Sequence, residues 1–110
     1  MFKYNPFDYV EFAKIINSCL VRAHAITDVI EDKGYVNNDM IALTFLTTND
    51  VTKFTEQGLR MERRTGKGIN NQFWLLEQNG QAERNTEFCR QMSEMLRQAG
   101  ILSTIVCQAD

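Results

Sequence analysis

The sequence predicts a small α+β domain in which helices and strands alternate, in the order helix, strand, helix, strand, helix, strand. Three segments repeat apolar residues every three or four positions, as amphipathic helices do, over residues 6–33, 50–64 and 81–99. Between them lie runs rich in β-branched and aromatic residues, typical of strands, over residues 40–47, 72–77 and 101–107. Because these runs are apolar on both faces, we expect a small sheet covered by helices on both sides.

The first helix is the most distinctive predicted element. Asn5 can cap it, Pro6 suits its first turn, and Gly34 suits a left-handed stop after Lys33. Such a helix would be about 40 Å long, whereas a compact chain of this size is about 35 Å across. Unless it breaks near Asn17, we expect it to overhang the domain and to offer apolar turns to a partner. Its apolar stripe consists of Tyr9, Phe12, Ile16, Cys19, Leu20, Ala23, Ile26 and Ile30.

The segment after Asp50 admits two alternatives. Leu59, Met61 and Arg63 also alternate as a strand would, with residues 65–68 as a turn into the next strand. That hairpin would give a ferredoxin-like strand-helix-strand-strand-helix-strand order after the N-terminal helix. In the other alternative, residues 39–46 form a short helix and residues 50–64 a recognition helix followed by a wing, as in a winged helix-turn-helix.

Length and composition bound the class of protein. The 110 residues predict a single domain over 1–110, and the net charge of −2 does not suggest a general nucleic-acid binder. The sequence shows neither a secretion signal nor an apolar run long enough to cross a bilayer. Its three cysteines are odd in number and far apart, which favours buried thiols in a reducing compartment. We therefore expect a cytoplasmic location, in a cell or in an infected host.

Groups that could support catalysis or bind a metal are scarce. His24 is the only histidine, and none of the three cysteines stands at a metal-ligand spacing from another. Cys19 and Cys89 have apolar neighbours, which favours inert burial over nucleophilic reactivity. We therefore expect no enzyme activity, no metal and no cofactor.

Basic residues gather in one part of the chain and form a candidate anion-binding site. Arginine side chains beside a glycine turn can hold phosphates or carboxylates, although they also commonly finish a helix end in solvent. Gly66 and Gly68 do not make a phosphate loop, because the upstream glycine of that motif is missing. A nucleic-acid-binding protein is therefore the alternative function, with phosphates bound by Lys53, Arg60, Arg63, Arg64 and Lys67.

The function that the sequence favours is a small protein-binding module, an inhibitor, adaptor or accessory protein of the kind that phages encode. The overlong first helix would bury its surplus apolar turns against a protein partner or against a second copy in a homodimer. An exposed tryptophan would add a binding hot spot. The expected partner-binding residues are Phe12, Ile16, Leu20 and Trp74.

Overall fold

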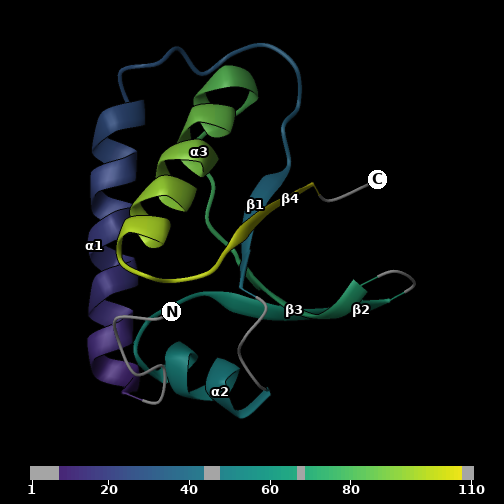
Figure 1. The fold of residues 1–110 in the computed structure, drawn as a ribbon. Helices are drawn as coiled ribbons and strands as arrows, with labels where there is room; N and C mark the ends of the chain where they lie inside the picture. Colours follow the sequence, from purple (N-terminus) through teal and green to yellow (C-terminus); the bar gives the residue numbers. More distant parts are fainter. Residues whose placement is uncertain (1–7, 44–47, 67–68, 108–110) are drawn as a thin grey trace.

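The structure, a computed structural model, describes residues 8–43, 48–66 and 69–107 and forms a small compact α+β fold (Figure 1). Its four strands make one antiparallel sheet in the order β2-β3-β1-β4. In chain order the elements are α1 (Tyr9–Thr27), β1 (Asp39–Leu43), α2 (Thr48–Glu56), β2 (Met61–Gly66), β3 (Ile69–Leu75), α3 (Ala82–Gln98) and β4 (Thr104–Cys107).

After α1 the observed order is strand, helix, strand, strand, helix, strand, which is the order of the hairpin alternative. The helix predicted over residues 50–64 is therefore too long. Gly58 ends α2 in a left-handed conformation with φ of 90°, and the amide of Leu59 donates to the carbonyl of Phe54 at 3.0 Å. The following residues pair with β3 as a strand. Residues 39–43 are a strand as well, so the winged helix-turn-helix alternative is wrong.

α1 is shorter than predicted, with 19 residues and a length of about 28 Å. Its first turn is capped by Asp8, whose carboxylate accepts from the amide of Glu11 at 3.1 Å; the predicted caps Asn5 and Pro6 lie outside the described residues. It ends at Thr27, not at Lys33. The longest dimension of the molecule is 39 Å, so α1 does not overhang its domain.

A polar contact explains this early end. Asn79, from the segment before α3, donates to the Thr27 hydroxyl at 2.6 Å and to the Asp28 carboxylate at 3.0 Å. These bonds fix the last turn against the rest of the molecule. The apolar period that continues through Ile30 therefore does not extend the helix.

One hydrophobic core lies between one face of the sheet and the helices. α2 belongs to this same side, because Phe54 contacts Phe12 of α1 with ring centroids 5.0 Å apart. The buried residues Ala42 and Trp74 are paired neighbours on the other face. Residues of all three described helices lie in the core on the first face. The prediction that helices also cover the second face is therefore not confirmed by the described residues. No described helix is long and apolar enough to span a membrane.

Candidate functional site

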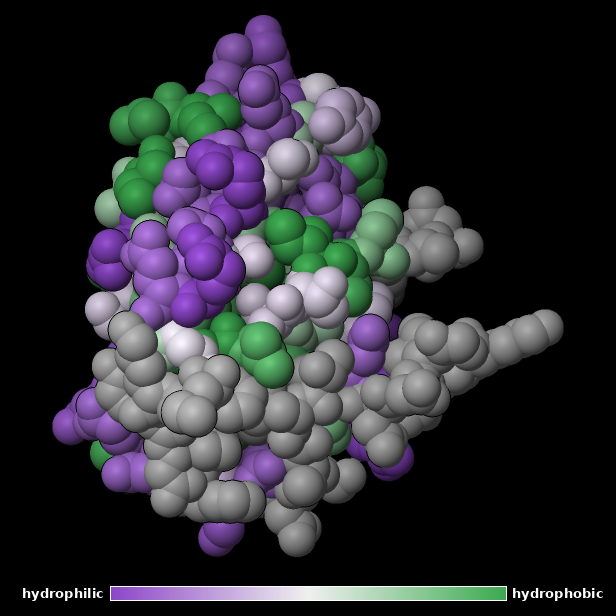
Figure 2. Space-filling view, viewed as in Figure 1, coloured by the Kyte–Doolittle hydropathy of each residue, from purple (hydrophilic) through white to green (hydrophobic). Residues whose placement is uncertain are grey.

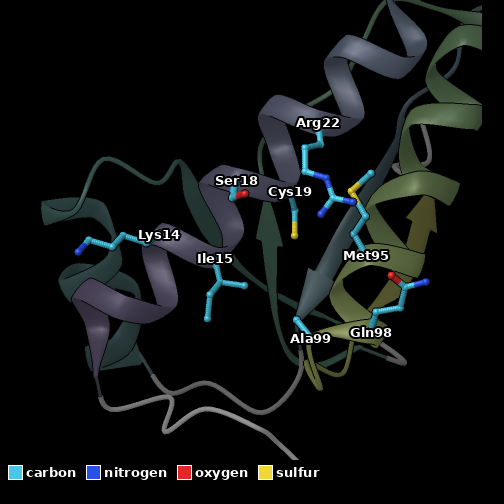
Figure 3. Close-up of a pocket in the computed structure, with 8 residues that line it drawn as sticks. All are labelled: Lys14, Ile15, Ser18, Cys19, Arg22, Met95, Gln98 and Ala99. Atoms are coloured by element: carbon cyan, nitrogen blue, oxygen red, sulfur yellow. The ribbon is translucent and has the colours of Figure 1, made fainter.

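A groove of about 340 Å³ lies between α1 and the C-terminal end of α3 (Figure 3). It forms because these antiparallel helices, which contact closely elsewhere, leave space beside the last turn of α3. Five lining residues come from α1: Lys14, Ile15, Ser18, Cys19 and Arg22. The other three are Met95, Gln98 and Ala99.

The inner surface of the groove is apolar. Cys19 and Met95 are buried, and Ile15 and Ala99 pack half-buried against the same core. Burial raises the pKa of the Cys19 thiol, although the nearby Arg22 charge opposes that shift. The thiol is therefore protonated near neutral pH and contributes apolar surface instead of a nucleophile.

The outer part of the groove carries positive charge. Arg22 reaches across the groove toward Met95, whereas Lys14 extends away from it at the other end (Figure 3). No carboxylate is among the lining residues, and no residue that the structure describes forms a salt bridge with either cation. Most arginines of the chain differ in this respect, because carboxylates lie within 4 Å of Arg60, Arg64, Arg84, Arg90 and Arg97. The groove thus combines an apolar floor with a cation that has no carboxylate neighbour among the described residues.

The four residues predicted to bind a partner are not exposed. Phe12, Ile16 and Leu20 of α1 are 1%, 0% and 9% exposed, because the sheet and α3 cover them within the same molecule. Trp74 is 5% exposed. The prediction that α1 presents this stripe to a partner is therefore corrected: these side chains belong to the interior of the domain.

The predicted anion-binding residues are dispersed. Arg63 and Arg64 are consecutive in β2 and so point to opposite faces of the sheet. The Arg64 guanidinium lies 4.7 Å from the centre of the Trp74 ring and contacts Glu62 at 3.1 Å. The remaining residues also lie apart, with Lys53 exposed on α2, Arg60 beside Glu77 at 3.8 Å, and Lys67 outside the described residues.

The His24 side chain lies between an aromatic ring and a carboxylate of the same chain. Its ring centroid lies 4.6 Å from that of Phe88, and its Nε2 atom lies 3.9 Å from the Glu77 carboxylate. Within the described ranges, no group of three histidine, cysteine, aspartate or glutamate side chains could hold a metal ion.

The most extensive polar feature that the sequence did not predict is a buried asparagine cluster at the other end of the α1–α3 pair. Asn85 donates to the Asn37 side chain at 3.0 Å and to the Asp39 carbonyl at 3.1 Å. It also accepts from the amide of Asn79 at 3.0 Å. In sequence these asparagines resemble ordinary turn and helix residues, and only the fold brings them together.

Comparisons of the chain with protein-family models, with curated proteins and with solved structures found no match.

Proposed function

We propose that this protein is a small non-catalytic protein-binding module that acts through its N-terminal helix, as an inhibitor, adaptor or accessory protein would. The observation that carries the proposal is the groove beside α1, to which this helix contributes five of the eight lining residues. Four of the lining residues are apolar, and binding sites usually combine such apolar surface with a few oriented polar groups.

The charge of the groove indicates what kind of partner fits. Arg22 stands over the apolar surface of Cys19 and Met95, without a carboxylate among the lining residues. A partner with an apolar side chain next to a carboxylate fits both features. Its apolar side chain would pack on Cys19 and Met95, while its carboxylate pairs with the guanidinium of Arg22. Lys14 and Arg22 are eight positions apart on α1, about 12 Å along the helix. That length suits about four residues of an extended peptide.

Selection from a random peptide display library tests this proposal directly. We expect enrichment of peptides in which Asp or Glu lies next to a large apolar residue. Their affinity should fall at least about tenfold for Arg22→Glu, since a charge-assisted hydrogen bond is replaced by repulsion.

The matched control is Lys33→Glu, which makes the same type of charge reversal at an exposed position outside the groove. It should leave the affinity within about twofold, allowing for the small effect of a distant charge. Enriched peptides without an acidic preference, or peptides that bind Arg22→Glu as tightly as the wild type, would refute the proposal.

Nucleic-acid binding has weaker support. It would need the basic residues of the segment around β2 on one surface, whereas Arg63 and Arg64 lie on opposite faces of that strand. The net charge of −2 also opposes attraction to a polyanion. A salt-dependent gel shift of DNA or RNA, absent in Arg63→Ala, would revive this alternative.

A further inference from the structure

The two edges of the sheet differ in how well they are protected against pairing with another strand. β2, at one edge, carries Glu62, Arg63 and Arg64 and has an irregularity in its pairing between Arg64 and Gly66. Charged side chains and bulges are the usual devices that keep an edge strand from adding a foreign strand.

β4, at the opposite edge, has neither device. Its sequence is Thr-Ile-Val-Cys, and the chain carries no charged residue from Gln98 to Ala109. It pairs regularly with β1 over all four residues, without a bulge. β-branched residues of this kind are the ones that strands prefer.

The surface beside β4 is also apolar. Ile105 is 43% exposed, and Leu102, just before the strand, is 62% exposed. Figure 2 shows hydrophobic surface gathered over β4 and the segment that leads into it, next to hydrophilic side chains that cover α3. An exposed, uncharged edge with adjoining apolar side chains is a template for strand addition.

We infer that β4 pairs antiparallel with β4 of a second copy, so that two four-stranded sheets join into one sheet of eight strands. An antiparallel pair of identical strands has two-fold symmetry. Each backbone hydrogen bond from the first copy to the second is therefore matched by the same bond from the second copy to the first. β4 itself carries no charged residue, so pairing it with β4 of a second copy sets no like charges directly opposite each other on the two strands. The assembly also stops at two copies, because its outer edges are the charged β2 strands.

This interface is separate from the α1–α3 groove and does not depend on it. Its short strand makes the interface small, so we expect a dimer that dissociates on dilution. Sedimentation velocity of the full chain over about a hundredfold range of concentration should show the dimer fraction rising with concentration.

Ile105→Lys places a charge on this edge and should abolish the dimer at every concentration where the wild type forms it. Val21→Lys is the matched control, because Val21 is also an exposed β-branched residue but lies on α1. It should dimerise as the wild type does, and so should Arg22→Glu, which tests the groove. If Ile105→Lys does not fold by circular dichroism, Thr104→Lys, at an exposed position on the same strand, takes its place.

A thiol cross-link gives an independent readout in the native protein. Cys107 is exposed, whereas Cys19 and Cys89 are buried, and burial together with the nearby Asp39 charge raises the pKa of Cys89 to about 12. If pairing is centred between Ile105 and Val106, the two Cys107 residues lie about 11 Å apart, within reach of a bis-maleimide. Cross-linked dimer should form in the wild type and fall at least about tenfold in Ile105→Lys.

Two results would overturn the inference. One is a wild-type chain that stays monomeric and yields no cross-link over the whole concentration range. The other is a dimer that persists unchanged in the folded Ile105→Lys variant, since this would place the contact elsewhere. Loss of the dimer in Arg22→Glu alone would assign the interface to the groove instead of to β4.

Discussion

The two ends of the α1–α3 pair are built in opposite ways. At one end, where α1 finishes and α3 begins, buried asparagines and an ion pair join the helices to the loops around them. At the other end the helices leave a groove with an apolar floor and a cation beside it. At the first, closed end the asparagine side chains find hydrogen-bond partners within the chain, whereas the groove at the second, open end leaves apolar surface and a cation available to a partner.

This difference indicates that the end with the asparagines stabilises the fold and that the end with the groove is available for binding. Hydrogen bonds between buried groups are costly to lose, because a buried donor or acceptor without a partner has no water to replace it. Substitutions at the closed end should therefore change stability. Substitutions at the groove should change binding while leaving stability nearly unchanged.

The largest expected effect is that of Asn85→Ala at the closed end. Asn85 is fully buried and connects Asn37, Asp39 and Asn79 by hydrogen bonds. Its removal takes away the acceptor of the buried Asn79 amide and the hydrogen bonds to Asn37 and Asp39, and we expect the free energy of unfolding to fall by about 3 kcal/mol. Urea denaturation followed by circular dichroism measures this change.

The control for this prediction is Asn17→Ala, the same substitution at an exposed position of α1. Its effect should stay within about 0.5 kcal/mol. Equal effects of the two substitutions would show that the asparagine cluster does not hold the closed end together.

An effect confined to acid pH should follow from Asp28. Hydrogen bonds from the Asn79 amide and the Arg84 guanidinium hold the pKa of the Asp28 carboxyl below its ordinary value. A carboxyl with a lowered folded-state pKa stabilises the fold above its unfolded pKa, and this contribution is lost as the pH falls through the folded value. The wild type should therefore lose stability below about pH 4.

Asp28→Asn should reduce this acid dependence, because the substituted side chain no longer titrates. Thermal melts from pH 7 down to pH 3 compare the two chains, with Glu56→Gln on α2 as the control. A wild-type profile that runs parallel to that of Asp28→Asn would contradict the assigned role of this carboxylate.

Local patterns in the sequence predicted the elements better than their ends. The helix expected over residues 81–99 is α3 (Ala82–Gln98), because its apolar stripe and the glycine after it are local signals. The error at residues 60–64 has a local cause. Phe54, Gly58 and Met61 have helical spacing, and only the left-handed conformation of Gly58 ends the helix there. The early end of α1 has a distant cause, since Asn79 contacts it from far along the chain.

The candidate site was less predictable than the fold. The stripe of α1 was identified correctly as apolar, but its members Phe12, Ile16 and Leu20 are covered by other parts of the same chain. The groove depends on how far α3 runs beside α1, which no spacing within either helix specifies. Arg22 stands out only when the carboxylates that pair with five of the other arginines have been located.

The smallest expected effect on stability, and the sharpest test of the open end, is Ser18→Trp. Ser18 is exposed on α1 and lines the groove, so an indole at this position would occupy the space over Cys19 without displacing a core residue. We expect the free energy of unfolding to change by no more than about 0.5 kcal/mol. Binding of the selected acidic peptides should weaken at least about tenfold, measured by isothermal titration calorimetry. Asn17→Trp places the same side chain on the preceding residue, about 100° around the helix and outside the groove lining. If both tryptophan variants lose binding equally, the peptides bind the outer surface of α1. If neither loses it, the open end of the helix pair is not the binding site.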